Sequence, residues 1–154
     1  MDDFPVCVPG ADGRTTLPSM QDVVLVAGVL LALLGMLTGL LAPVAKNRRA
    51  LLTSHLEGTA NGTLLIAFGL TWPYLVLPDA VELVTAALAI YGTYANWFAT
   101  LLSGMWGAGK KTMPLASGDY EGTKTQENVI AVLLLTTAVT IIAATVLILV
   151  GLIR

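Results

Sequence analysis

The stretch VVLVAGVLLALLGMLTGLLAPVA, residues 23–45, contains no charged side chain and stops at the basic segment that begins with Lys46. A helix that crosses a bilayer needs about 20 mostly apolar residues, so this stretch predicts a transmembrane helix. The whole chain of 154 residues agrees, because it is 56% hydrophobic and 12% charged, whereas soluble domains are roughly 25% charged. The sequence therefore predicts a membrane protein.

Three further segments complete an all-α, integral membrane four-helix transmembrane bundle. The second is the least obvious, because a full crossing places His55, Glu57 and Asn61 inside the helix. The connections are too short to form a separate soluble domain, which predicts a single transmembrane domain over residues 1–154. The predicted spans after the first cover residues 51–77, 80–106 and 129–153.

The basic residues predict the orientation. Short cytoplasmic loops carry an excess of Lys and Arg, and with four crossings the first and third connections lie on one side. Those connections hold six of the eight basic residues: Lys46, Arg48, Arg49, Lys110, Lys111 and Lys124. Only Arg14 and Arg154 remain for the other side. We therefore expect both termini outside the cytoplasm.

The charge balance and the metal-binding residue types exclude two classes of function. Eight basic against ten acidic residues give a net charge of -2, which leaves no broad basic patch for nucleic acid. One Cys and one His exclude a structural zinc site within one chain, because such a site takes about four Cys or His ligands.

Polar residues concentrate on the second helix. The string HLEGTANG, residues 55–62, places His55, Glu57 and Asn61 within seven positions, while Gly58 and Gly62 leave one helix face without side-chain bulk. Small residues of this kind let a neighbouring helix approach closely. They could equally make room for a large flat cofactor beside the histidine, and ionisable residues inside a span mark functional sites.

A second cluster lies in the third helix, in the string YGTYANW, residues 91–97. Tyr94 and Trp97 are three residues apart and share a helix face, and Tyr91 lies one turn before Tyr94 on the same side. These rings lie near the predicted bilayer centre, so an aromatic belt at the membrane interface does not explain them.

The residues leave three roles open for His55. It could belong to a proton relay, it could be a structural histidine that hydrogen-bonds a carbonyl or Glu57, or it could bind haem iron. As the single imidazole of the chain it would leave one axial position of the iron open, since electron-transfer cytochromes fill both with His or Met. Glu57 could also orient the imidazole of His55 through its second nitrogen.

The strings at residues 55–62 and 91–97, in a chain with four predicted spans, resemble the hydroxylaminobenzene mutase family. These small bacterial membrane isomerases are themselves similar to the styrene oxide isomerases. The resemblance covers the four-span layout, and its specific signal lies in the second and third helices.

The resemblance implies a homotrimer in the bacterial cytoplasmic (inner) membrane, with haem b at the subunit interfaces. His55 would be the axial ligand of the haem iron, and Asn61 would lie near the open side of the iron. Six residues along a helix amount to about 9 Å of rise and 240° of rotation, so one helix cannot easily place both at the same iron, whereas a neighbouring protomer could.

On the third helix, Asn96 matches the asparagine of the family and Tyr94 takes the place of a tryptophan in the epoxide isomerases. Those enzymes have an aspartate near the position of Gly92 and a tyrosine at the position of Thr100. Without that acid and that phenol, the resemblance favours the hydroxylamine branch over the epoxide branch.

The implied reaction converts an aryl hydroxylamine such as hydroxylaminobenzene into 2-aminophenol without net redox change, with ferric haem as a Lewis acid. Such apolar aromatic substrates partition into the lipid bilayer, and the reaction would serve the catabolism of aromatic compounds. The candidate catalytic residues are Asn61, Tyr94 and Asn96. The candidate cofactor-binding residues are His55, Gly58 and Gly62, and the candidate substrate pocket is Tyr91, Trp97 and Thr100.

Two other functions stay open. One is an epoxide isomerase of the styrene oxide type. The other is a small four-helix transporter that depends on one carboxylate within the membrane, for which Glu57 is the candidate. A transporter gives no reason for His55 or for the aromatic cluster of the third helix.

Overall fold

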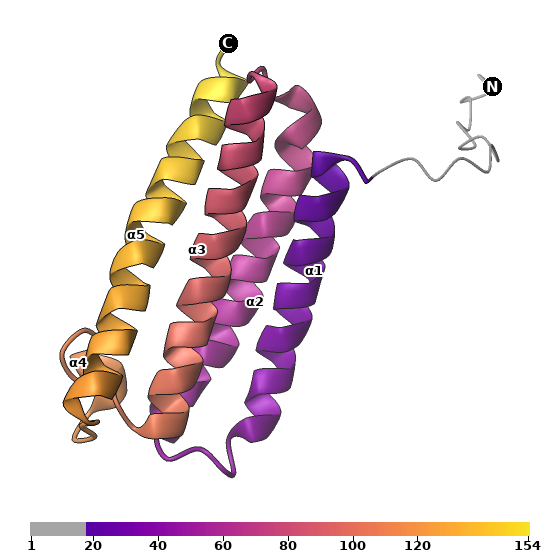
Figure 1. Ribbon diagram of the computed structural model, residues 1–154. Helices are drawn as coiled ribbons and strands as arrows, with labels where there is room; N and C mark the ends of the chain where they lie inside the picture. The colour runs from indigo at the N-terminus through magenta and orange to yellow at the C-terminus, as the bar shows by residue number, and fades with distance from the viewer. Residues whose placement is uncertain (1–17) are drawn as a thin grey trace, which may run out of the picture.

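The computed structural model describes residues 18–154, and within that part of the chain the protein is helical without strands, which confirms the predicted all-α class. Four long helices run side by side, and a short fifth helix lies in the third connection (Figure 1). Two single 3-10 turns follow the first two long helices. The elements are α1 (Met20–Thr38), η1 (Gly39–Leu41), α2 (Arg48–Thr71), η2 (Trp72–Tyr74), α3 (Asp79–Trp106), α4 (Pro114–Ser117) and α5 (Lys124–Leu152).

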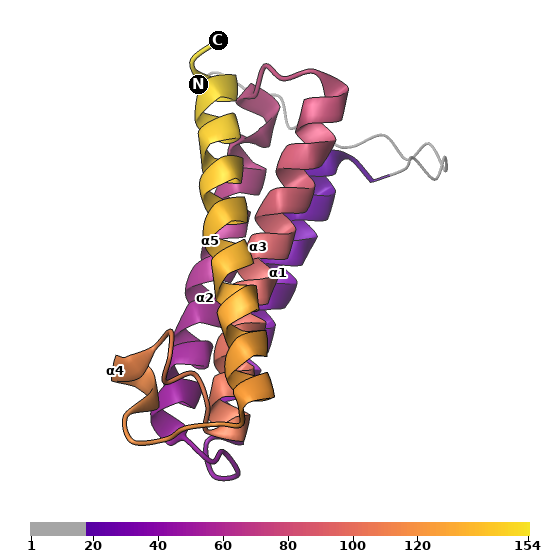
Figure 2. The ribbon, with the colours of Figure 1, turned by 60° about the vertical axis from the view of Figure 1, so that its left-hand side comes forward.

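The long helices follow a row in which each packs mainly on its neighbours. Helix α2 lies between α1 and α3, and α3 lies between α2 and α5 (Figures 1 and 2). The α1–α2 and α3–α5 connections meet at one end of the molecule, and the α2–α3 connection lies at the other end (Figure 1). Helix α3 therefore contacts α2 on one side and α5 on the other, so its side chains can take part in contacts with both helices.

Three helices begin earlier than the apolar runs predict, because polar caps extend them. α2 begins at Arg48 instead of residue 51, since the side chain of Asn47 caps its first turn. α1 begins at Met20 instead of residue 23, since Ser19 and Asp22 form a capping box. α5 begins at Lys124 instead of residue 129, since Thr123 and Gln126 do the same. A capping box satisfies two free backbone donors of the first turn, so the helix starts at the box and not at the first apolar residue.

Two helices also end earlier than predicted. α1 ends at Thr38 and tightens into η1, ahead of Pro43, whereas the apolar run continues to residue 45. α2 ends at Thr71, because Pro73 has no backbone N–H to continue the helical hydrogen bonds. α3 differs by one residue from its predicted start and ends at Trp106 as predicted, followed by Gly107 in the left-handed conformation with φ 63°.

Two helices are long and apolar enough to cross a membrane. The segment Met20–Leu41 has a mean hydropathy of 2.6 over its most apolar window and Lys124–Leu152 has 2.7. Only 28% and 17% of these windows are buried inside the protein, so most of their apolar side chains face outward. A soluble core helix would instead bury most of its window, so the outward exposure fits lipid as the surrounding medium. α2 and α3 do not reach that hydropathy.

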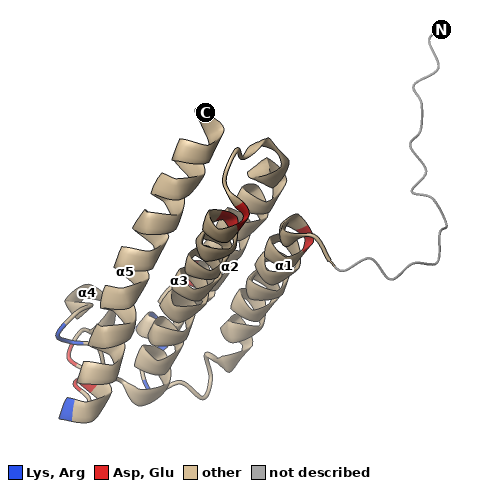
Figure 3. Ribbon diagram, turned by 45° about the horizontal axis from the view of Figure 1, so that its top comes forward, with Lys and Arg blue, Asp and Glu red and all other residues tan. Residues whose placement is uncertain are grey.

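Most basic residues gather at one end of the helix axis, where acidic residues of the third connection accompany them (Figure 3). The α1–α2 and α3–α5 connections, with the six basic residues predicted to be cytoplasmic, lie at one end. Asp22, Asp79 and Glu82 lie at the opposite end, near the starts of α1 and α3. These basic residues thus lie at one end of the molecule, as the predicted orientation in the membrane requires.

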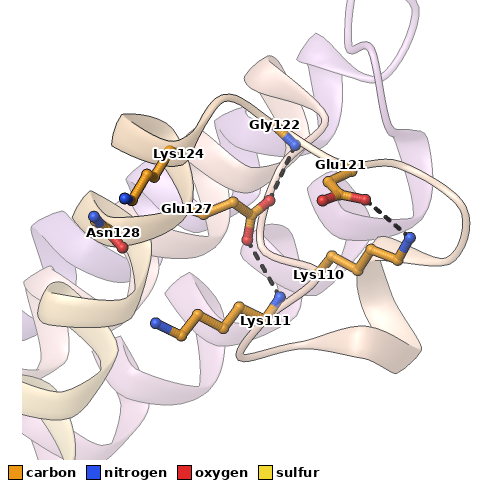
Figure 4. Close-up of a pocket in the computed structure, with 7 residues that line it drawn as sticks. All are labelled: Lys110, Lys111, Glu121, Gly122, Lys124, Glu127 and Asn128. Atoms are coloured by element: carbon orange, nitrogen blue, oxygen red, sulfur yellow. Dashed lines mark hydrogen bonds and ion pairs between the residues drawn. The ribbon is translucent and has the colours of Figure 1, made fainter.

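The third connection is folded around the buried carboxylate of Glu127. Its Oε1 accepts from the backbone N–H of Gly109 at 2.8 Å and of Gly122 at 3.0 Å, and its Oε2 accepts from that of Lys111 at 3.2 Å. Figure 4 shows this carboxylate beside a hollow of about 430 Å³. No sequence motif marks Glu127, although a carboxylate in the first turn of a helix is well placed to bind free N–H groups of a preceding loop.

Candidate functional site

Glycines bring α1 and α2 into backbone contact. A Cβ added at Gly58 would lie 2.5 Å from the Cα of Gly35, and one at Gly62 would lie 2.4 Å from the backbone nitrogen of Ala32. These distances leave no space for a side chain. Of the two alternatives for Gly58 and Gly62, the structure shows the seating of a neighbouring helix, and within one chain α1 occupies the space beside both.

His55 lies on the side of α2 that faces α1. Its Nδ1 is 2.8 Å from the backbone carbonyl oxygen of Gly35. A carbonyl oxygen can only accept, so Nδ1 carries the hydrogen and donates it, which leaves the lone pair of a neutral imidazole on Nε2. A Cβ added at Gly39 would lie 3.2 Å from Nδ1, so this glycine leaves room for the ring.

The end of α1 explains why the carbonyl of Gly35 is free. In a continuing α-helix this oxygen would accept from the N–H of Gly39, four residues on. The N–H of Gly39 instead bonds the carbonyl oxygens of Met36 and Leu37, because the chain tightens into η1 there. The early end of α1 therefore supplies the acceptor that orients His55. Metal-bound histidines commonly donate their second N–H to a carbonyl in this way.

Glu57 lies on the other side of α2, toward α3, and joins two candidate catalytic asparagines. Its Oε2 accepts from Nδ2 of Asn61 at 3.2 Å and from Nδ2 of Asn96 at 2.7 Å. Asn61 is buried, and Glu57 and Asn96 are half-buried. The structure thus brings Asn61 and Asn96 together through the carboxylate of Glu57, for which a contact with His55 was expected instead.

The three aromatic candidates of α3 line one shallow apolar groove of about 370 Å³, together with Phe98 and Leu133. Their polar atoms bind neighbouring helices. Tyr94 donates to the carbonyl oxygen of Ala27 at 2.9 Å. Trp97 donates from Nε1 to Oγ1 of Thr38 at 3.0 Å. Tyr91 shares a hydrogen bond of 3.0 Å with Thr136 on α5. The groove therefore has fixed walls and an apolar surface.

Thr100 does not line this groove. It is buried, and its hydroxyl donates to the backbone carbonyl oxygens of Asn96 and Trp97, within its own helix. The predicted pocket residues thus separate into Tyr91 and Trp97, which line the groove, and Thr100, which packs inside the bundle.

Within one chain the candidates form three separate groups. His55 faces α1, the cluster of Glu57, Asn61 and Asn96 lies between α2 and α3, and the groove lies between α3 and α5.

Gly35 and Glu57 are the residues whose part in this arrangement the sequence analysis missed. Gly35 has no role in the sequence prediction, although the nearby Pro43 is a signal that the first helix ends early. The spacing of Glu57 and Asn61, four residues apart, was the available signal for a contact on one helix face. No pattern in the sequence pairs Glu57 with Asn96.

A family model and two curated relatives all match this chain over most of its length. The family described as styrene oxide isomerase matches residues 20–153. The chain is 47% identical over 135 residues to hydroxylaminobenzene mutase HabA of Ectopseudomonas oleovorans, which covers 88% of this chain and 100% of the relative. It is 48% identical over 125 residues to hydroxylaminobenzene mutase HabB of the same organism, covering 81% of this chain and 76% of the relative. No solved structure shows a significant match.

Proposed function

The chain belongs to the styrene oxide isomerase family, and from this premise we propose that it is a haem-dependent mutase that converts an aryl hydroxylamine such as hydroxylaminobenzene into 2-aminophenol. It is an isomerase, as are its relatives. The substrate class follows from the two relatives named hydroxylaminobenzene mutases, each nearly half identical to this chain. The main structural support for the proposed haem dependence is the hydrogen bond that His55 donates to the carbonyl oxygen of Gly35.

The residues of this chain fit haem b. His55 would bind the iron through Nε2, because Nδ1 is already committed to the carbonyl oxygen of Gly35. The imidazole is half-buried, so its free nitrogen is open to a ligand that approaches from outside the chain. Bound haem would supply a Lewis acid that polarises the N–O bond of the substrate.

The reaction moves a hydroxyl group from nitrogen to the ortho ring carbon, next to the carbon that bears nitrogen, and returns the hydrogen of that ortho carbon to nitrogen. Substrate and product therefore have the same atoms. The chain's part is to hold the ring and exclude water, which would otherwise attack the ring at another carbon. Tyr91, Tyr94 and Trp97 offer ring faces that attract the positive charge formed as the N–O bond breaks. Asn61 and Asn96 orient the N–H and O–H groups.

We further propose that all four long helices cross the bacterial cytoplasmic membrane with both termini outside, and that three copies form a homotrimer with haem at the subunit interfaces. The outward apolar surfaces of α1 and α5 support burial in lipid. The separation of His55 from Asn61 on α2 supports a shared site, because a neighbouring copy can bring the two together across an interface.

The second candidate function is isomerisation of an epoxide of the styrene oxide type. It is supported by the matching family, which is described as styrene oxide isomerase. The two reactions give different products from different substrates. Supplying hydroxylaminobenzene and styrene oxide separately to the purified protein, and measuring 2-aminophenol against the carbonyl product of the epoxide, decides between them.

The test of haem dependence is an absorption spectrum of the protein purified in detergent, with and without added haem. We expect a Soret band in the wild type and its loss in His55→Ala, together with loss of isomerisation. Thr63→Ala is the matched control, because that hydroxyl on α2 only donates within its own helix and is exposed. Absence of the Soret band and of haem-dependent activity in the wild type contradicts the proposal, and retained haem in His55→Ala excludes this ligand.

A further inference from the structure

We propose that Glu57 is a positioning residue that selects substrates able to donate hydrogen bonds, and so favours aryl hydroxylamines over epoxides. The inference rests on the proposed function, because it concerns how Asn61 and Asn96 present themselves to a substrate. It assigns Glu57 neither to haem nor to ion transport.

The carboxylate is committed to the two asparagines. One oxygen, Oε2, takes an N–H from each amide, at 3.2 Å from Asn61 and 2.7 Å from Asn96. Within residues 18–154 the recorded ion pair is Lys110 with Glu121, so Glu57 has no cationic partner there. Hydrogen bonds to a carboxylate are roughly twice as strong as those between neutral groups. The orientation of both amides is thus held more firmly than two neutral partners would hold it.

The two hydrogen bonds to Glu57 determine the orientation of each asparagine amide. With Nδ2 turned to Glu57, the carbonyl oxygen Oδ1 of each asparagine points away from the carboxylate. In the described part of the chain no donor binds either Oδ1, and no buried side-chain polar atom there lacks a partner. Both oxygens are therefore accessible from outside, and so is Oε1 of Glu57 for the same reason. The cluster presents three acceptor oxygens, whereas each amide has already given one of its two N–H donors to Glu57.

An aryl hydroxylamine matches such a cluster, because it carries two donors, one N–H and one O–H. An epoxide carries an oxygen acceptor and no donor, so once bound it covers these oxygens and gives them no hydrogen. A polar group that is buried without a partner costs about 1–3 kcal/mol. The cluster therefore discriminates by the polarity of the hydrogen bond, independently of the size of the ring.

The competing roles of Glu57 do not fit its contacts. It does not orient His55, whose Nδ1 donates to Gly35 on the other side of α2. A carboxylate that carries ions through a membrane must exchange partners, whereas Glu57 bridges two helices through two amide donors. These contacts are those of a group that fixes its neighbours.

The kinetic experiment compares Glu57→Ala and Glu57→Gln with the wild type in the haem-loaded protein. We expect Glu57→Ala to raise KM for hydroxylaminobenzene about tenfold, the effect of one misaligned hydrogen bond of about 1.4 kcal/mol. It should also raise the share of 4-aminophenol among the products, because a less firmly held ring is attacked by water. Glu57→Gln keeps an acceptor oxygen and should restore part of both values.

Glu82→Gln is the matched control. This half-buried carboxyl accepts from Nε1 of Trp72 at 2.5 Å, away from the asparagines, so the product ratio should not change. If Glu57 only stabilises the fold, its variants lower the amount of active protein and leave KM and the product ratio at wild-type values. That result overturns the proposal.

A second measurement does not depend on turnover. The chain has four asparagines, at positions 47, 61, 96 and 128, so labelling with ¹⁵N-asparagine gives four pairs of side-chain amide signals. Glu57→Gln should shift the signals of Asn61 and Asn96 alone. Aniline, an unreactive N–H donor, should shift the same two in the wild type, whereas styrene oxide should not. Equal shifts with both ligands, or none with aniline, overturn the proposed selection.

The two proposals fail in different ways. A wild-type protein that makes no 2-aminophenol contradicts the proposed function, and the amide signals still decide whether donors are recognised. A wild-type protein that makes 2-aminophenol, with unchanged KM and product ratio in Glu57→Ala, contradicts only the role of Glu57.

Discussion

At the scale of single residues, Gly35 both packs against α2 and orients the imidazole of the candidate haem ligand His55. Glycine at position 35 lets α1 meet Gly58 of α2 backbone to backbone, and the carbonyl of the same residue orients the imidazole. The position of the ring therefore depends on how closely two helices approach. A change that separates the two helices disturbs both the packing and the orientation of the candidate ligand.

Gly35→Ala tests this dependence. The added Cβ would lie 2.5 Å from the carbonyl carbon of Gly58 and from the backbone nitrogen of Thr59, so the helices must separate. We expect a loss of about 1–3 kcal/mol in the free energy of unfolding, as overpacking costs, and weaker haem binding. Thermal unfolding in detergent and a haem titration measure both.

Ala60→Val is the control for Gly35→Ala, because it adds carbon atoms to an exposed position of α2. It should leave the unfolding temperature and haem affinity near wild-type values. Wild-type stability and haem affinity in Gly35→Ala contradict the close approach of the two helices.

At the scale of elements, the third connection is ordered by one side chain. Glu127 binds three backbone N–H groups of the segment before it, so the loop is attached to the start of α5. The exposed ion pair of Lys110 with Glu121 adds little, because surface pairs are worth about 0–1 kcal/mol. The order of this loop therefore depends on the buried carboxylate.

Glu127→Ala should make the loop open more often. Three backbone donors lose their acceptor, and leaving such groups without partners costs about 1–3 kcal/mol each. We expect tryptic cleavage after Lys110 and Lys111 to become at least about tenfold faster, since cleavage follows the population of the open form. Glu121→Ala, which removes only the ion pair, should cleave at nearly the wild-type rate. Equal rates in both variants contradict the role of Glu127.

At the scale of the whole molecule, the six basic residues at one end predict its orientation in a membrane. Thiol labelling tests it, in a Cys7→Ser background that removes the one natural cysteine. In intact cells, an impermeant maleimide should label Arg154→Cys and not Lys111→Cys, and in broken cells it should label both. Labelling of Lys111→Cys alone in intact cells reverses the orientation.

The sequence predicts the long helices better than their ends. Apolar runs report which segments are helical, but the caps at Ser19 and Thr123 lie outside those runs, and Pro73 ends a helix inside one. The residues of the site were predictable in the same limited way. Their types were visible in the sequence, whereas the contact of Glu57 with Asn96 depends on the pairing of α2 with α3, and no local pattern encodes that pairing.

The polar contacts between α2 and α3 have a consequence for how the chain is made. Neither helix is as apolar as α1 or α5, so each alone enters lipid poorly. Between them Asn96 donates to Glu57, Ser54 to the carbonyl oxygen of Trp97, and Trp72 to Glu82. Satisfying these groups within the pair removes much of the cost of inserting them. During synthesis, we therefore expect α2 and α3 to leave the translocation channel together, as one helical hairpin.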